Sequence, residues 1–302
     1  MAVKNKPILE KLQEKFGEAN IETRLAGLLH AQDITYRDYI HTETLLSLQK
    51  PRTKFPDEMV FIMYHQITEL YFKLILWEIK QVFEADEKFA ALQKCFERIS
   101  RYFDALSHSF SIMKNGMEKE QYMQFRDTLT PASGFQSFQY RLIELQSTLP
   151  KNLTDVRYRN EEASEAQDLL EKLYWQTAGK KPNSEKKSPL IANFLKKHSH
   201  ALEQEILRSN GGRNLWSIYS SMSKKEQENK HLIETMRHFD QTANITWVMS
   251  HYHTAKQYIG EGKATGGSDW QKYMHPKFQK RIFFPTLYTE NEIAHWGHDE
   301  DL

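Results

Sequence analysis

The chain has 302 residues, 39% of them hydrophobic, which is enough to bury one substantial core. Its 41 basic and 40 acidic residues nearly cancel to a net charge of +1, and this balance argues against nucleic acid or an anionic membrane surface as a partner. The N-terminal stretch lacks the apolar core of a signal peptide, and charged residues interrupt every apolar run that a membrane span would need.

Helical spacing of the apolar residues predominates along the chain, since only five valines are present and regular alternation is rare. Segments rich in Pro, Gly, Ser and Lys divide the chain at 50–56, 129–134, 148–152, 179–189 and 210–213. We therefore predict a single all-α domain over 1–302, a multi-helix bundle with long central helices at about 56–86 and 240–260. The basic segment 179–189 is expected to be an exposed loop.

The helix predicted around "MVFIMYHQITELYFKLILW" (59–77) is apolar on nearly all sides, with 14 apolar residues among 19. It should therefore lie at the centre of the bundle, where its few polar side chains need partners. Phe61, His65 and Glu69 are spaced to share one face. Two interpretations remain open: a buried network in which Glu69 pairs with Lys73, or a cavity into which His65 points.

The composition supplies many potential ligands and flat apolar surfaces, with thirteen histidines, six tryptophans, fourteen tyrosines and seventeen phenylalanines. This suits a planar cofactor or substrate. The single cysteine, Cys95, excludes an internal disulfide and suits a reducing, cytoplasmic setting. It occupies an apolar position of a predicted helix and is expected to fill the core rather than to act as a catalytic thiol.

The next polar cluster lies in "EQYMQFRDTLTPASGFQSFQYR", residues 120–141. Tyr122 and Arg126 are one turn apart, near a helix end that the proline at 131 enforces. The planar guanidinium of Arg126 suits a carboxylate, although a surface ion pair would explain it equally well. Ser133, with Gln136 three residues later, has the spacing of a capping box for the following helix.

The last candidate segment begins at His251 and His253, two residues apart on the predicted helix. Its core stripe is predicted to be Ile245, Val248, Met249, Tyr252, Ala255 and Ile259. The two histidines lie on opposite flanks of this stripe, so only one of them can face a given site. His251 shares a column with Trp247 and Tyr258, which favours it slightly. The loop "ATGGSD" that follows lacks the phosphate-loop pattern.

A competing metal signal comes from two Glu-x-x-His pairs, Glu228 with His231 and Glu292 with His295. This spacing occurs in di-iron helical bundles. The first pair lies in a heavily charged stretch that is typical of a solvated face, and the second lies close to the C-terminus. We therefore keep a di-iron centre as a minor alternative.

Taken together, four ordered blocks resemble the tryptophan 2,3-dioxygenase family. They are "ITYRDYIHTETLLSLQ", "DEMVFIMYHQITELYFKL", "YMQFRDTLTPASGFQSFQYR" and the segment from His251 to the Thr-Gly-Gly at 265–267. The resemblance implies an all-α, cytoplasmic homotetramer, a dimer of dimers, with haem b buried between helices. It also implies an enzyme that uses ferrous haem and dioxygen to cleave the indole C2–C3 bond of L-tryptophan. The product would be N-formylkynurenine, in the first step of the kynurenine route.

The resemblance also implies roles for individual residues. His65 resembles the catalytic distal histidine, which hydrogen-bonds the indole N–H. His251 resembles the axial ligand of the haem iron, because it precedes Thr265 by the fourteen positions found in the family. The implied substrate-binding residues are Phe61, Ile62, Met63, Tyr64, His65, Tyr122, Arg126, Ser133 and Thr265, with Tyr36, Tyr39 and Ile40 reaching in from a neighbouring subunit on the N-terminal segment 1–45.

The chain departs from the family in the loop, where the usual pattern is G-T-G-G-[ST]-S-G. Here Ala264 replaces the first glycine, and Asp269 and Trp270 follow the serine. These changes leave the contact with the substrate ammonium open. Two other functions also stay open: a haem oxygenase of the same fold that acts on a modified indole or another aromatic amino acid, and a non-catalytic helical haem sensor or carrier. A Soret band and turnover of L-tryptophan separate these possibilities.

Overall fold

The computed structural model describes residues 7–129, 134–161, 165–178, 187–260, 271 and 274–298. The chain divides into two compact units, Met1–Lys50 and Pro51–Leu302. The first unit holds the short helices α1 (Ile8–Phe16), α2 (Glu18–Leu28), α3 (Tyr36–Ile40) and α4 (Thr42–Leu45). Thr35 caps α3 through a reciprocal capping box with Asp38. Most of the apolar side chains of this unit are exposed, so it has little core of its own.

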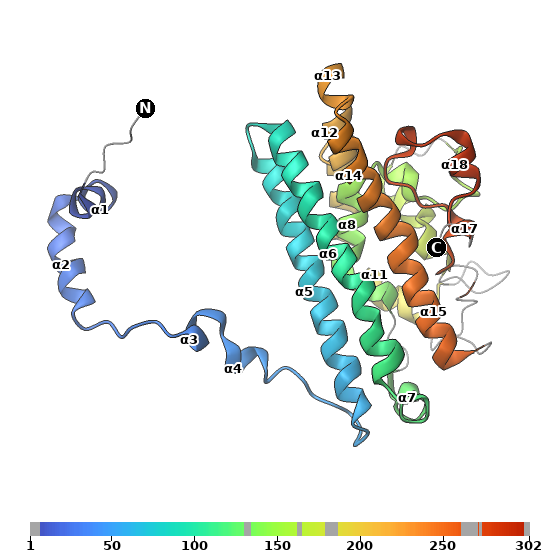
Figure 1. Ribbon diagram of the computed structural model, residues 1–302, viewed down its shortest axis with the longest axis horizontal. Coiled ribbons are helices and arrows are strands. Elements are labelled where there is room, and N and C mark those ends of the chain that lie inside the picture. Colours follow the sequence, from blue (N-terminus) through green and yellow to red (C-terminus); the bar gives the residue numbers. More distant parts are fainter. Residues whose placement is uncertain are drawn as a thin grey trace. The chain divides into compact units, whose positions relative to one another are not determined.

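The second unit is built on two long helices, α5 (Asp57–Glu84) and α6 (Lys88–Gly116), which pack side by side (Figure 1). The helices α14 (Lys230–Gln241) and α15 (Trp247–Ile259) pack on α6, and α8 (Phe138–Ser147) packs on α5. Next to α8 lies α11 (Pro189–Asn210), which also contacts α9 (Ala166–Lys172). The shorter helices are α7 (Lys119–Arg126), α10 (Tyr174–Ala178), α12 (Leu215–Ser220), α13 (Lys224–Gln227), α17 (Pro276–Gln279) and α18 (Glu290–Ala294).

The predicted all-α fold is confirmed, since no strand occurs in the part of the chain that the structure describes. Side-chain caps set several helix starts: Ser137 accepts from the Tyr140 N–H at α8, and Ser188 and Asn229 do the same at α11 and α14. The cap of α8 is thus Ser137, while the cap expected at Ser133 precedes a separate 3-10 turn at Gly134–Gln136. Ser133 itself lies outside the described residues.

Buried aromatic rings dominate the core of the second unit. Phe96, Phe103, Phe239, Phe283 and Phe284 are fully buried, and their rings contact one another between α6, α14 and the C-terminal segment. Such rings bury large apolar areas and add favourable edge-to-face contacts. Cys95 is buried in the same core, as predicted, and burial raises the pKa of its thiol. No helix in the described ranges is long and apolar enough to cross a membrane.

The helix predicted at 240–260 is interrupted by a π-helical turn at Thr242–Thr246, between α14 and α15. Asp240 anchors this junction: its carboxylate accepts from the backbone N–H groups of Phe283 and Phe284 and from the Asn244 amide, at 2.8–3.1 Å. Burial raises the pKa of Asp240 to about 7, while these donors oppose the rise. The junction therefore fixes how α15 leaves α14, and with it the direction of the α15 side chains.

The core stripe predicted for α15 is only partly correct. Val248 and Met249 are buried, but Tyr252, Ala255 and Ile259 remain partly exposed. The face that packs on α6 is instead the column of Trp247, His251, Thr254 and Tyr258. The physical reason is that α15 lies between α6 and the C-terminal segment, so more than one of its sides is covered.

The expected position of α5 at the centre of the bundle is not found within the Pro51–Leu302 unit. The inner face of α5 packs through Phe72, Ile75, Ile79 and Val82, while its opposite face exposes a row of large apolar side chains. The Glu69–Lys73 pairing, one of the two interpretations left open for this helix, is not found among the described residues. Glu69 instead accepts a 2.8 Å hydrogen bond from the Gln139 amide on α8, because α8 packs against that side of α5.

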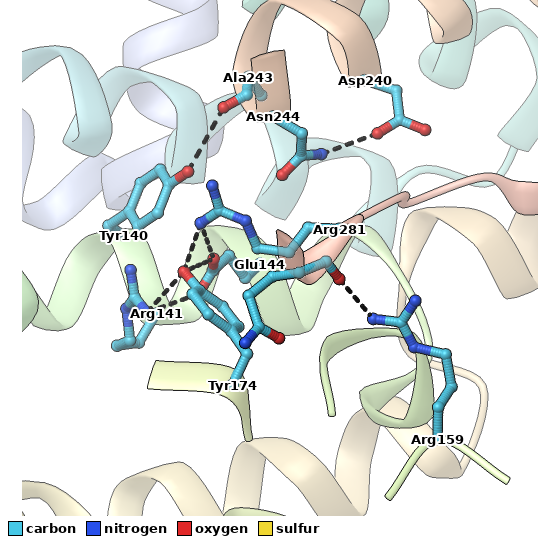
Figure 2. Close-up of polar contacts among 10 residues, drawn as sticks. Tyr140, Arg141, Glu144, Arg159, Tyr174, Asp240, Ala243, Asn244 and Arg281 are labelled. Carbon is cyan, nitrogen blue, oxygen red and sulfur yellow. Dashed lines mark hydrogen bonds and ion pairs between the residues drawn. The ribbon is translucent and has the colours of Figure 1, made fainter. Parts of the chain in front are cut away.

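A fully buried polar cluster joins the C-terminal segment to α8 and α10 (Figure 2). The Tyr174 hydroxyl donates to Glu144 at 2.7 Å and accepts from Arg141 at 3.0 Å and Arg281 at 2.6 Å. Both guanidinium groups also pair with Glu144. Burying these charges is tolerable because each is hydrogen-bonded. Through Tyr140, which donates to the Ala243 carbonyl and packs on Trp247, the cluster supports the start of α15.

Candidate functional site

A second apolar cluster, separate from the main core, gathers where α5, α6, α7 and α15 meet. Its buried members are Tyr64, Phe110, Met113, Met117 and Tyr258, with Val60, Phe61, Tyr122, Trp247 and Ile259 packed against them. Two histidines border this cluster from opposite elements, His65 on α5 and His251 on α15. They lie close enough that the charge of one imidazole lowers the pKa of the other. The aromatic walls and two imidazoles make it the candidate site.

The His251 imidazole is fixed by rings on α6 and α15. It stacks on Phe110, with ring centroids 5.7 Å apart and planes 19° apart, and it contacts Trp247 at 6.2 Å. A methyl group added to Gly134 would lie 4.0 Å from His251 Cε1, so the turn after residue 133 passes beside this ring. Burial lowers the pKa of His251 to about 4. The imidazole is therefore neutral at physiological pH, which is the form that ligates a metal.

The His65 imidazole has its tautomer set by its own helix. Nδ1 lies 2.7 Å from the Phe61 carbonyl oxygen, which only accepts, so Nδ1 carries the proton and Nε2 keeps its lone pair. Phe61 also stacks near the ring, with centroids 4.1 Å apart. Solvent reaches the side chain, yet the surrounding protein lowers its pKa by desolvation. The exposed Nε2 of this ring is therefore available as a hydrogen-bond acceptor.

Helix α7 carries Tyr122 and Arg126 to the same aromatic cluster. Asp57 at the start of α5 accepts from the Glu118 N–H at 2.6 Å, and its own N–H donates to Gln121 at 3.2 Å, which ties α7 to α5. Tyr122 then contacts Phe61 and Tyr258, with centroids 6.2 and 5.0 Å away. Arg126, one turn later, is close enough to lower the Tyr122 pKa, although burial raises that pKa more. The guanidinium of Arg126 thus lies near the aromatic cluster that contains Tyr122.

This arrangement is matched by comparisons with known proteins. Residues 26–209 match the family model described as tryptophan 2,3-dioxygenase. The chain belongs to the tryptophan 2,3-dioxygenase family. A tryptophan 2,3-dioxygenase of Ruegeria sp. (strain TM1040) is 28% identical over 277 residues, covering 86% of this chain and 92% of the relative. One from Bacillus thuringiensis subsp. konkukian (strain 97-27) is 30% identical over 271 residues, covering 85% and 92%. One from Exiguobacterium sibiricum is 29% identical over 274 residues, covering 85% and 92%.

The family assignment confirms the resemblance inferred from the four sequence blocks. The chain thus belongs to a family of oxidoreductases that oxidise tryptophan. The residues present also fit the haem that this family implies. His251 offers a neutral nitrogen donor, and the rings of Phe110, Trp247 and Phe61 provide flat apolar walls suited to a porphyrin. His65 lies close enough to His251 to lower its pKa, and would contact the substrate rather than the iron if haem were held by His251.

The structure does not bring together every residue expected in a tryptophan 2,3-dioxygenase pocket. Phe61 and His65 share one side of α5, but Met63 lies about 200° around the helix from Phe61 and is exposed on the other side. Ile62 is partly buried on a flank, and Tyr64 is buried against Phe110. Five consecutive helical residues cannot face one ligand, so only Phe61 and His65 are retained in the proposed pocket.

Other expected site residues are placed elsewhere. Ser133 and Thr265 lie outside the described residues, as do Ala264, Asp269, Trp270 and most of the predicted loop 179–189. In the N-terminal unit, Tyr36 and Tyr39 are 76% and 75% exposed and Ile40 is 39% exposed. These three side chains are therefore available to another molecule.

Sequence reasoning missed Phe110, the ring on which His251 stacks. It also missed a structural contact of Tyr258. The Tyr258 hydroxyl donates to the carbonyls of Met113 at 2.5 Å and Met117 at 2.9 Å, and so satisfies carbonyl groups at the C-terminal end of α6. Nothing in the local sequence around Phe110 distinguishes it from the other apolar positions of α6. Only the packing of α15 on α6 does so.

The di-iron alternative finds no support. His231 pairs with Glu97 at 2.8 Å on the surface, and Glu292 pairs with Arg237 and caps α18. No group of three or more His, Cys, Asp or Glu side chains suited to a metal ion occurs within the described parts of the chain. One member of each Glu-x-x-His pair, His231 or Glu292, thus takes part in helix packing or a helix start.

The lowered pKa of His251 predicts a pH-dependent stability of the haem-free protein. The pKa of His251 is about 4 in the folded protein and 6.5 ordinarily. Between pH 4 and pH 6.5, His251 therefore binds a proton more readily in the unfolded chain than in the folded one. Stability should therefore be lost as the pH falls below about 6.5, by about 2 kcal/mol at about pH 5. Urea unfolding at about pH 7.5 and about pH 5 measures this.

The matched control is the neighbouring exposed histidine. Changing His251 to Gln should remove most of this acid-induced loss, because Gln does not titrate. Changing His253 to Gln should leave it unchanged, since that ring is exposed to solvent. Equal acid sensitivity of the wild-type protein and H251Q would contradict the assignment.

Proposed function

We propose that this chain is a haem b-dependent dioxygenase that cleaves the C2–C3 bond of L-tryptophan to N-formylkynurenine, using dioxygen as co-substrate. The observation that supports the proposal is the aromatic cluster bordered by two imidazoles, neutral His251 on α15 and accessible His65 on α5, with the guanidinium of Arg126 near Tyr122 of the same cluster. When bound, ferrous haem supplies the oxygen chemistry. The residues of the chain bind, orient and enclose the substrate.

Each side chain contributes one element of substrate placement. His251 would hold the haem iron. His65 would accept a hydrogen bond from the indole N–H at Nε2, because Nδ1 carries the proton and donates it to the Phe61 carbonyl. Phe61 and Tyr122 would press the indole ring flat, and Arg126 would hold the carboxylate through two charge-assisted hydrogen bonds. With the indole N–H and the carboxylate both held, the substrate would bind in a single orientation, which fixes the positions of C2 and C3.

Replacement of His65 by Ala tests the distal assignment. The substitution should leave haem bound, because His65 contacts the substrate rather than the iron, and should lower kcat/KM by about 1–3 kcal/mol through the lost hydrogen bond. Turnover of L-tryptophan by the reduced protein and the Soret absorbance measure the two effects. Loss of haem with H65A would mean that the two faces are reversed. A wild-type Soret band without turnover would favour the haem sensor or carrier.

We also propose that the chain assembles as a homotetramer, a dimer of dimers, in which Tyr36, Tyr39 and Ile40 of one subunit complete the pocket of a neighbour. Their exposure on a unit with little core supports this exchange. Deletion of residues 1–40 should therefore abolish most turnover while the helical content of the remaining chain stays intact. Sedimentation and assay of the truncated protein measure this, and full activity in a truncated monomer would contradict it.

A further inference from the structure

The π-helical turn between α14 and α15 interrupts a helix that packs along α6 both before and after the turn. Figure 1 shows α14 and α15 following one another beside α6. Before the turn, the ring of Phe239 contacts that of Phe103 on α6. After the turn, His251 stacks on Phe110, and the Tyr258 hydroxyl donates to two carbonyl groups at the end of α6. Side chains on both sides of the turn thus face the same helix.

A regular α-helix would not place these side chains on one face. At about 100° per residue, the twelve positions from Phe239 to His251 would leave the two side chains about 120° apart around the axis, and Tyr258 would lie about 100° from Phe239. A π-helical turn bonds residues five apart instead of four and so takes up one additional residue. The two angles then fall to about 20° and nearly zero, in agreement with the contacts on α6. The turn therefore decides that His251 faces α6.

This turn is held from outside the helix (Figure 2). The carboxylate of Asp240, fully buried in the last turn of α14, accepts from the Asn244 amide inside the π-helical turn at 2.8 Å. The same carboxylate accepts from the backbone N–H groups of Phe283 and Phe284 at 2.9–3.1 Å. Asp240 thus ties the turn to the C-terminal segment. An amide in its place would lose one acceptor oxygen, and its NH₂ group would face N–H donors.

We propose that Asp240 is a positioning residue for the haem: it holds the π-helical turn in place, and the turn directs the His251 imidazole toward α6 and the candidate site. This inference rests on the proposed function, which makes His251 the axial ligand. In an uninterrupted helix Ser250, eleven positions after Phe239, would take the direction that His251 has here. A serine hydroxyl is not among the side chains that ligate haem iron, so the helix would then offer no donor.

The first test follows the orientation of α15 in the haem-free protein. Thr254 is buried in the same column as His251, and the native Cys95 is buried elsewhere, so T254C introduces a reporter thiol. This thiol should react slowly with iodoacetamide. In D240N/T254C it should react about tenfold faster or more, because α15 turns and opens locally once the π-helical turn is no longer held. N244A/T254C should also react faster, since this change frees the turn and leaves the C-terminal segment bonded to Asp240.

The matched control loosens the C-terminal segment without touching the turn. The Thr148 hydroxyl, which is buried after α8, donates to the Phe283 carbonyl and so holds the same residue from the other side. T148V/T254C should therefore react as slowly as T254C alone. Circular dichroism measures whether each variant keeps its helical content.

A deletion asks whether a regular helix makes Asp240 dispensable. Removing Thr246 takes out the additional residue, so α14 and α15 can continue as one α-helix with the same face on α6. With that face set by the helix itself, adding D240N to the deletion variant should leave the T254C thiol protected. If Asp240 only anchored the C-terminal segment, the deletion would not restore this protection.

The haem-loaded protein gives a spectroscopic measurement of the same role. D240N should shift or broaden the iron–imidazole stretch and weaken haem binding by about tenfold or more, as expected for a change behind a metal ligand. T148V should change neither. In D240N kcat should fall while KM for L-tryptophan changes little, because the Asp240 hydrogen bonds go to the turn and the C-terminal segment rather than to the aromatic cluster.

The outcomes separate this role from the proposed function. A T254C thiol that stays protected in both D240N and N244A, or that is exposed equally by T148V, would overturn Asp240 as a positioning residue. Exposure of the thiol by the deletion alone, in a folded protein, would show that the turn does not set the face of α15 and would overturn it as well. A wild-type protein that binds no haem, with the thiol reactivities as expected, would overturn the proposed function and leave the held turn in place.

Discussion

Replacement of His251 by Ala should abolish haem retention, because the substitution removes the one neutral nitrogen donor that faces the candidate site from α15. Loss of a single outer partner of a metal ligand costs about 10- to 100-fold in metal affinity, so loss of the ligand itself should cost about 100-fold or more. The ferrous wild-type protein should show the visible and resonance Raman signature of a five-coordinate histidine haem, and H251A should lose the iron–imidazole stretch.

The neighbouring histidine supplies the control for this experiment. His253 lies two residues away, about 200° around the helix, and is exposed, whereas His251 is stacked on Phe110. H253A should therefore keep both the haem and the iron–imidazole stretch. The reverse pattern would assign the iron to His253. A further variant, F110A, should keep the stretch but broaden or shift it, because the imidazole loses the ring that fixes its plane.

The second large effect is expected at Arg126. Changing it to Ala should lower kcat/KM for L-tryptophan by about 2–4 kcal/mol, roughly 30- to 900-fold, because two charge-assisted hydrogen bonds to the carboxylate are lost. Lys should restore little of this, since an ammonium group lacks the planar fork. Steady-state kinetics of R126A and R126K against the wild type give these values directly.

The substrate offers an independent check of the same contact. Tryptamine lacks the carboxylate, so the wild-type enzyme should use it poorly, and R126A should discriminate far less between tryptamine and L-tryptophan. Changing Arg101, an exposed arginine on α6, to Ala provides the matched control and should leave both substrates unaffected. Equal use of tryptamine and L-tryptophan by the wild type would show that Arg126 does not hold the carboxylate.

Local sequence determined the elements of this protein and the grouping of residues within each element. The helical spacing of apolar residues, with few valines, was sufficient for the all-α fold, because a helix is stabilised by contacts between residues three and four apart. The same short-range geometry placed Phe61 with His65 and set His251 apart from His253. The four sequence blocks that resemble the tryptophan 2,3-dioxygenase family indicated which residues to expect at the site.

The relations between elements depended on the tertiary structure. Glu69 was expected to pair with Lys73 one turn away, yet its hydrogen bond comes from Gln139, seventy positions along the chain. Phe110 showed no local signal, yet it fixes the His251 ring. Such contacts are determined by how α8 and α15 pack on α5 and α6, which no helical period encodes.

The two errors about buried faces have one physical cause. The apolar pattern of α5 indicated burial on all sides, and that of α15 indicated a single stripe, but a pattern records only that a side chain favours leaving water. It does not say which element, or which copy of the chain, will cover it. On α15 the packing placed the column of Trp247, His251 and Tyr258 against α6. On α5 the packing within the Pro51–Leu302 unit covered one face and left Met63, Ile67, Leu70, Leu74 and Trp77 exposed.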